Sequence, residues 1–283
     1  PEVYVMLPLD TVAENGQLRD AHGLGQMLDK MAEASVDGFM VDVWWGLTEP
    51  KPREYNFAAY KDLVAMAKAR GLKMQCVTSF HQCGGNVGDD CKVLLPPFVY
   101  NVDGIWYRDV EGDDTREYIS LFADKVTVAG RTPLEMYGDW FEAFAQEFGS
   151  ELGATIAEVM VGMGPAGELR YPSYRLDKWR FCGVGAFQAY DRHALASLRA
   201  AAVAAGHPEE WGVPPNASST GGYNKYPHET EFFTRGFQTD HGKFFLDWYF
   251  SSLKNHGKAV LAAAKAAFGG KVGIAGKISG IHW

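Results

Sequence analysis

One glutamate follows a tight turn at the end of an apolar segment. Residues 157–161 are predicted to form a buried strand, and the turn at 164–167, with glycine at both ends, leads directly to Glu168. Glycine and proline favour tight turns, and Leu169 and Tyr171 place apolar surface beside the acid. Such surroundings disfavour the charged form of a carboxyl group, as a general acid near neutral pH requires. Glu168 is therefore a candidate general acid, although a lone glutamate after a strand is more often a surface residue or a helix cap.

Three further polar residues lie where two other apolar segments end. Asp42 interrupts the apolar run 40–46, and a buried aspartate needs a partner or a function. A structural hydrogen bond and substrate binding are equally compatible with it. His81 ends an apolar strand and opens the segment 81–89, which contains three glycines. This composition predicts either a mobile flap with Asp89 at its tip, closing onto a ligand, or an ordinary flexible turn.

Lys277 and His282 lie toward the end of the last apolar segment, which is expected to form a strand within 272–283. A single lysine or histidine near a strand end is usually solvated or structural. These two become candidates for binding only together with the residues above.

The spacing of apolar runs predicts alternating strands and helices. Strands are expected at 3–9, 38–45, 72–80, 157–164 and within 272–283, and helices at 20–34, 57–70, 133–148, 185–205 and 241–268. Repeated units of this kind predict an α/β fold with a parallel sheet. The long segments at about 81–131 and 165–240 each follow the carboxyl end of a strand, where barrel enzymes build their sites. The stretch 206–240 is expected to be a loop.

Composition limits the partners. The net charge of −8 over 283 residues argues against nucleic acid and anionic membranes. No apolar stretch approaches the roughly 20 residues of a membrane span. Eight Trp, 13 Tyr and 17 Phe suit either stacking on sugar rings or an aromatic core. No ligand cluster implies a metal or an organic cofactor.

The four cysteines, at 76, 83, 91 and 182, match no zinc pattern and no dense disulfide framework. Reduced thiols in the cytoplasm or a plastid stroma are therefore expected. Cys76 is predicted to pack in a strand, and Cys83 to be exposed and modifiable in its glycine-rich loop.

Long blocks of sequence closely resemble the plant-type β-amylases of glycoside hydrolase family 14. The blocks are MLPLD at 6–10, VDVWWG at 41–46, SFHQCGGNVGD at 79–89, GMGPAGELRYP at 162–172 and GIHW at 280–283. The resemblance implies a (β/α)8 TIM barrel. It also implies inverting exo-hydrolysis of α-1,4-glucosidic bonds, releasing β-maltose from the non-reducing ends of starch or malto-oligosaccharides.

The resemblance also implies roles for individual residues. Glu168 matches the general acid of the family, and Asp89 matches the acidic residue of its closing loop. Asp42 and His81 match residues that hold the terminal glucose. Lys277 and His282 match further sugar-binding positions.

The resemblance covers only part of a barrel. About the first five of eight strands are expected in residues 1–283, as a single catalytic domain that is incomplete at its carboxyl end. An inverting glycosidase needs a second carboxylate as general base, which the family places beyond this point. Activity of residues 1–283 alone is therefore not expected. If this chain were active by itself, Glu49 or Glu158 would be the first candidates for the base.

Three interpretations of this pattern remain open. The missing part belongs to the natural protein, a separate chain or partner completes the barrel, or the chain is a non-catalytic relative that binds or senses glucan. The presence of Glu168 and Asp89 favours an enzyme. The sequence does not indicate the oligomeric state or the preferred glucan.

Overall fold

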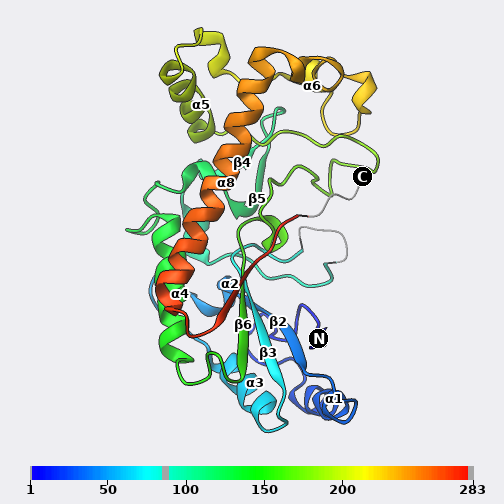
Figure 1. Cartoon of the computed structure of the whole chain (residues 1–283), viewed down its shortest axis with the longest axis vertical. Coiled ribbons are helices and arrows are strands. Elements are labelled where there is room, and N and C mark those ends of the chain that lie inside the picture. The colour runs from blue at the N-terminus through cyan, green and yellow to red at the C-terminus, as the bar shows by residue number, and fades with distance from the viewer. Residues whose placement is uncertain (1, 85–88, 280–283) are drawn as a thin grey trace.

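The computed structural model describes residues 2–84 and 89–279, and its centre is a sheet of five parallel strands (Figure 1). The strands lie in chain order: β1 (Tyr4–Met6), β2 (Gly38–Trp44), β3 (Lys73–Ser79), β6 (Ile156–Val161) and β7 (Gly273–Gly276). Every neighbouring pair is parallel. The predicted α/β fold with five strands is confirmed. Within the described residues β1 and β7 form the two edges of the sheet.

Eight α-helices are found in the described residues. They are α1 (Ala21–Glu33), α2 (Trp45–Thr48), α3 (Ala58–Lys68), α4 (Pro133–Glu147), α5 (Arg192–Ala204), α6 (Ala217–Thr220), α7 (Glu231–Thr234) and α8 (Asp240–Phe268). Local sequence sets their ends: Thr132 and Glu135 form a capping box at the start of α4, and α8 ends at Gly269 in the left-handed conformation. Of these described helices, none is both long and apolar enough to cross a membrane.

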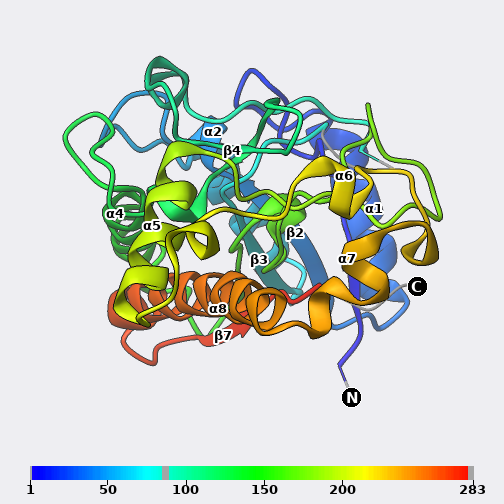
Figure 2. The ribbon, with the colours of Figure 1, turned by 90° about the horizontal axis from the view of Figure 1, so that it is seen from above.

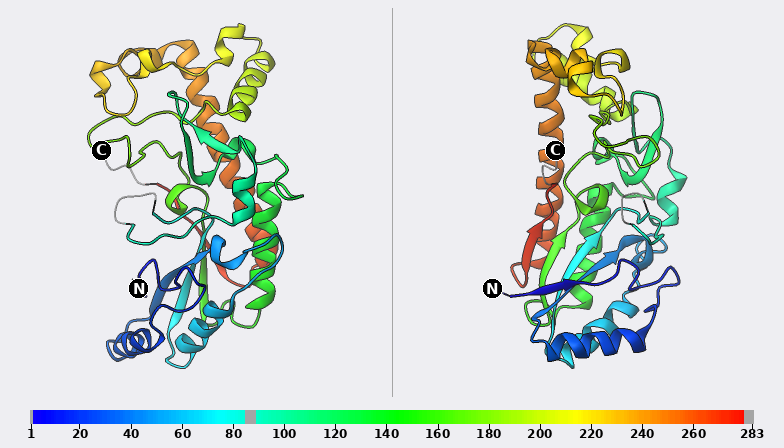
Figure 3. Two further views of the ribbon diagram at one scale, coloured as in Figure 1. Left: turned by 180° about the vertical axis from the view of Figure 1, so that it is seen from behind. Right: turned by 90° about the vertical axis from the view of Figure 1, so that its right-hand side faces the viewer.

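The molecule is elongated, with the sheet toward one end. The strands lie beside α1 and α3, whereas α5, α6 and the first turns of α8 form the opposite end (Figures 1 and 3). Helix α8 joins the two ends and packs along α4. Seen from above, α8 runs beside β7 (Figure 2). The helix therefore fixes the long segment that follows β6 against the sheet.

The segment 81–131 contains a hairpin that the spacing of apolar residues did not predict. Strands β4 (Trp106–Arg108) and β5 (Asp114–Ile119) pair antiparallel and form a separate two-stranded sheet. Short helical turns flank the hairpin at Pro97–Asn101 (η1) and Leu121–Ala123 (η2). The alternation of apolar residues in β5 is short and lies among Gly and Asp residues. The sequence of this segment therefore predicts a loop.

Other boundaries also differ from the prediction. Strand β1 ends before Pro8, which has no N–H for a sheet ladder. Helix α5 begins at Arg192 rather than near 185, because the Asp191 side chain caps it by accepting hydrogen bonds from His193 N and Ala194 N. The expected loop 206–240 contains α6, α7 and the short turns Glu209–Gly212 (η4), Pro227–Glu229 (η5) and Gly236–Gln238 (η6).

Many aromatic side chains lie in the core between the sheet and α4. Phe80 contacts Tyr137 with ring centroids 4.5 Å apart, and Trp140 at 5.4 Å. Phe57 packs edge-on against Trp140 at 5.6 Å. These four residues are all buried, and such ring pairs stabilise beyond their buried area. A large share of the aromatic content therefore belongs to the core rather than to a sugar-binding surface.

Candidate active site

The carboxyl ends of four parallel strands lie level with one another. In the registers, Trp44 of β2 pairs with Ser79 of β3, Thr78 with Val161 of β6, and Val161 with Gly276 of β7. The candidate residues therefore lie at one edge of the sheet. Asp42 lies two residues before the end of β2, whereas His81, Glu168 and Lys277 come after β3, β6 and β7.

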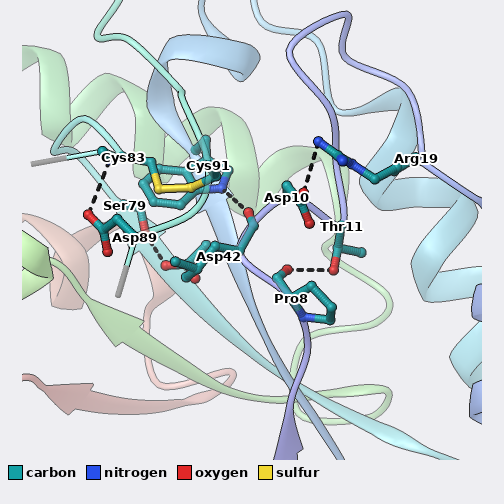
Figure 4. Close-up of a disulfide and its surroundings, with 12 residues drawn as sticks. Pro8, Asp10, Thr11, Arg19, Asp42, Ser79, Cys83, Asp89 and Cys91 are labelled. Atoms are coloured by element: carbon teal, nitrogen blue, oxygen red, sulfur yellow. Dashed lines mark hydrogen bonds and ion pairs between the residues drawn. A yellow bond between two sulfur atoms is a disulfide. The ribbon is translucent and has the colours of Figure 1, made fainter. Parts of the chain in front are cut away.

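Asp42 is a buried carboxylate that has one oxygen available. Its Oδ1 accepts a hydrogen bond from Ser79 Oγ at 2.6 Å, whereas Oδ2 is buried without a partner among the described residues (Figure 4). Burial raises the pKa of Asp42 to about 6, although the Ser79 hydrogen bond and the positive charge of Lys277 oppose the shift. The sequence left a structural bond and ligand binding open. The structure shows the structural bond on Oδ1 and leaves Oδ2 as an acceptor for a ligand.

His81 is a buried imidazole that, like Asp42, has a polar atom without a hydrogen-bond partner among the described residues. It is 7% exposed, its Nδ1 has no hydrogen-bond partner within residues 2–84 and 89–279, and its ring packs against Trp44 with centroids 5.2 Å apart. Burial lowers the pKa of His81 to about 3, and the cations Lys277 and Arg170 add to the shift. The imidazole is therefore neutral near pH 7. Its ring can donate or accept one hydrogen bond without bringing a charge into the site.

Glu168 lies in a more polar setting than its neighbours in the sequence suggested. Its Oε2 accepts a hydrogen bond from Arg170 Nε at 2.8 Å, and its side chain is 23% exposed. Leu169 and Tyr171 are its sequence neighbours, but the contact that orients the carboxylate is an ion pair. The expectation of a largely apolar environment was wrong, because the chain folds Arg170 back onto Glu168.

The turn before Glu168 is held by groups from several elements. Pro165–Gly167 forms a 3-10 turn (η3), in which Ala166 has φ +53°. Lys277 Nζ donates to the Ala166 carbonyl at 2.8 Å, and the N–H of Leu169 donates to the Lys277 carbonyl, also at 2.8 Å. The end of β7 is thus joined directly to the segment that carries Glu168. Lys277 was expected to bind sugar, and the structure shows that its ammonium group donates one hydrogen bond to this turn.

A disulfide closes the base of the glycine-rich segment. Cys83 and Cys91 are bonded, with their Cα atoms 5.8 Å apart, and Cys83 is 3% exposed (Figure 4). The expectations of four reduced thiols and of an exposed Cys83 were wrong, because the chain returns antiparallel at the Cys83–Val93 bridge and brings the two sulfurs together. Cys76 is free and buried as predicted, and Cys182 is free and exposed.

Asp89 lies inside this disulfide ring and close to Asp42. Its Oδ2 accepts a hydrogen bond from Gly84 N at 3.1 Å, and its negative charge contributes to the raised pKa of Asp42. Residues 85–88, the middle of the predicted flap, lie outside the described residues. His282 also lies outside them. The structure therefore brings together Asp42, His81, Asp89, Glu168 and Lys277 of the candidate residues, and describes nothing of His282.

Glu117 is a site residue that the sequence did not reveal. It is 6% exposed on β5, and its Oε1 accepts a hydrogen bond from the N–H of Ala166 at 2.8 Å. With Gln82, Tyr174 and Arg170, the hydrogen-bond partner of Glu168, it lines a pocket of about 260 Å³. No local signal in the sequence could have found it, because its partner lies 49 residues away.

Two other groups of carboxylates have structural partners. Glu49 is fully buried and binds Trp45 Nε1 at 2.7 Å, the N–H of Arg53 at 2.8 Å and the guanidinium of Arg131. A carboxylate held in this way is not free to activate water. Asp109, Glu111 and Asp113 bring carboxylate oxygens within 4.8 Å of one another, but the Lys178 ammonium group binds all three.

Glu158, the other candidate for the base, lies in the amino-terminal half of β6, where it pairs with Gln75 and Gly273. This position is away from the edge where the site lies.

The sheet and the polar groups at its carboxyl edge define an α/β protein of the barrel class. Residues 4–283 match the family model described as Glycosyl hydrolase family 14. The chain belongs to this family.

Relatives of known name agree with the assignment. The chain is 47% identical to "Beta-amylase 2, chloroplastic" of Oryza sativa subsp. japonica, with 99% of this chain and 52% of the relative covered. It is 46% identical to "Beta-amylase" of Vigna unguiculata, with 99% and 58% covered. The catalytic domain of beta-amylase from Paenibacillus polymyxa superposes with a TM-score of 0.79 at 31% identity, covering 100% of this chain and 67% of that chain. The chain thus spans little more than half the length of these curated relatives.

Proposed function

We propose that this chain is the part of a β-amylase that binds the non-reducing end of an α-1,4-glucan and supplies the general acid. The reaction is inverting hydrolysis that releases β-maltose from starch or malto-oligosaccharides. The observation that carries the proposal is the meeting of Glu168, Asp42 and His81 at the carboxyl edge of the sheet, in a family member whose named relatives are β-amylases. We propose one catalytic domain over residues 1–283, with site-forming insertions at about 81–131 and 165–240.

Each candidate residue has a specific task in this proposal. Oδ2 of Asp42 and Nδ1 of His81 bind hydroxyl groups of the terminal glucose, and Asp89 contacts the same sugar. Glu168 gives its proton to the glycosidic oxygen, and the hydrogen bond from Arg170 orients its carboxyl group. Lys277 and His282 provide further sugar-binding positions. A second carboxylate activates water on the opposite face of the ring.

We propose that this second carboxylate lies outside these residues, as the resemblance to β-amylases implies. Named relatives extend well beyond the matched part, and the sheet described here has five strands where a closed barrel has eight. We therefore propose that activity requires the strands that complete the barrel. Because several relatives are named chloroplastic, we propose a plastid stroma or the cytoplasm as the compartment.

Replacing Glu168 tests the assignment of the acid. In the protein encoded by the natural reading frame, Glu168→Gln should lower kcat on the order of 10²- to 10⁴-fold, the usual contribution of general acid catalysis. Binding of malto-oligosaccharide should change little, because its contacts come from other residues. Steady-state kinetics and calorimetric titration with maltose measure the two quantities.

The same measurements separate the enzyme from a glucan-binding relative. A wild-type protein that binds malto-oligosaccharide but releases no maltose would contradict the enzymatic proposal. Turnover of Glu168→Gln within a few-fold of wild type would reject Glu168 as the acid. Glu135→Ala, at the exposed start of α4, is a suitable control because it alters the capping box of that helix and none of the candidate site residues.

A further inference from the structure

The turn that presents Glu168 contains a residue in an unfavourable backbone conformation. Ala166 has φ +53°, a left-handed value that is unfavourable for a residue with a Cβ atom. Gly167 follows with φ +74°, where glycine carries no such penalty. The conformation of Ala166 therefore depends on contacts from outside the turn.

Two charged groups form hydrogen bonds with the backbone of Ala166. The Glu117 carboxylate accepts the Ala166 N–H at 2.8 Å, and the Lys277 ammonium group donates to the Ala166 carbonyl at 2.8 Å. Hydrogen bonds in which one partner is charged are stronger than neutral ones. An anion on the donor and a cation on the acceptor thus fix the two peptide groups that flank this residue, two positions before Glu168.

Glu117 also joins the turn to the segment after β3. Its backbone carbonyl accepts the N–H of Gln82 at 2.8 Å, directly after His81. Strand β5 lies outside the parallel sheet, so the hairpin adds a second connection between the segments that follow the paired strands β3 and β6. A substitution of the Glu117 side chain removes the bond to Ala166 but leaves the backbone bond to Gln82 in place.

We propose that Glu117 is a positioning residue that holds Glu168 in its reactive place through the N–H group of Ala166. This inference rests on the proposed role of Glu168 as general acid. Glu117 itself contacts the turn, and it acts on the reaction through the position of Glu168. A shift of about 1 Å in a catalytic group can cost on the order of 10²-fold in rate.

Three variants of the protein encoded by the natural reading frame test the proposal. Glu117→Ala removes the acceptor and should lower kcat about 10- to 100-fold with KM within about twofold of wild type. Glu117→Gln keeps an oxygen that can accept the Ala166 N–H and should retain most of kcat. Glu117→Asp keeps the charge but is one methylene shorter, so it should fall toward the alanine variant. It also replaces Glu117→Ala if the alanine variant fails to fold.

A double-mutant cycle separates positioning from stability. In the Glu168→Gln background, Glu117→Ala should lower kcat no further, because the group that it positions is already absent. The control Glu135→Ala loses a helix cap outside the site, and it should lower the urea midpoint while kcat per folded molecule stays unchanged.

Each contrary result has a defined meaning. A Glu117→Ala variant that loses activity only in proportion to its folded fraction would overturn the proposal. A rise in KM at unchanged kcat would instead make Glu117 a glucan-binding residue and would overturn it as well. If Glu168→Gln itself keeps its turnover, the proposed function fails. If Glu168→Gln loses turnover and Glu117→Ala does not, only the present inference fails.

Discussion

The individual residues of the candidate site differ in charge state although they lie close together. Asp42 has a pKa raised to about 6 by burial, and His81 has a pKa lowered to about 3 by burial and nearby cations. Between pH 5 and 7 the imidazole therefore stays neutral, whereas Asp42 changes from largely protonated to largely ionised. A change in sugar binding over this range should depend on Asp42 and not on His81.

This difference gives a prediction for the pH dependence of binding. A charged acceptor binds a hydroxyl group more strongly than a neutral one, by about 1 kcal/mol. Maltose should therefore bind about three- to fivefold more weakly at pH 5 than at pH 7, since Asp42 gains a proton as the pH falls through about 6. Calorimetric titration at both values measures this ratio.

The variant Asp42→Asn provides the comparison. An amide does not titrate, so its weaker binding should be the same at both pH values. The same dependence in wild type and Asp42→Asn would assign the titration to another group. Maltose itself carries no titratable group, so the dependence must come from the protein.

Among the elements, the segment after β3 differs most from what the sequence indicated. The position of its disulfide was not predictable from spacing alone, because four cysteines allow several pairings and a separation of eight residues suits either a bond or two free thiols. The pairing depends on the antiparallel return of the chain at Cys83 and Val93. The disulfide closes a short ring of residues that includes Asp89. The sequence alone had predicted that Asp89 lies on an unconstrained loop.

Removing the disulfide should destabilise the protein without abolishing the fold. The double variant Cys83→Ser, Cys91→Ser should lower the free energy of unfolding by about 2–3 kcal/mol, as loop-closure entropy predicts for a ring of this size. Urea unfolding under oxidising conditions measures the change. Cys182→Ser is the matched control, because Cys182 is an exposed free cysteine and its replacement should have no effect.

Counting thiols tests the pairing independently. Of the four cysteines in residues 1–283, only Cys76 and Cys182 should react with a thiol reagent in the unfolded, unreduced protein, as peptide mapping would show. Labelling of Cys83 and Cys91 as well, or an unchanged urea midpoint in the double variant, would contradict the disulfide.

At the scale of the whole molecule, the features set by the geometry of a parallel sheet were the most predictable from sequence. Apolar strands of a βα repeat run in one direction, so Asp42, His81, Glu168 and Lys277 were expected at one edge. The registers set the ends of β2, β3, β6 and β7 level with one another, and these strands carry or directly precede the four residues. Glu117 could not be predicted, because it reaches Ala166 from a hairpin outside the sheet. Arg170 was also missed, since only the fold of its turn directs it back to Glu168.

We propose that the site at the carboxyl edge of the sheet performs inverting hydrolysis from the non-reducing end of a glucan. The most direct measurement uses the protein encoded by the natural reading frame and monitors malto-oligosaccharide hydrolysis by proton NMR. The anomeric signal of the first maltose released reports the stereochemistry. We expect the β-anomer before mutarotation, with maltose as the first product. Initial release of the α-anomer, or of mixed longer oligosaccharides from internal cleavage, would contradict the claim.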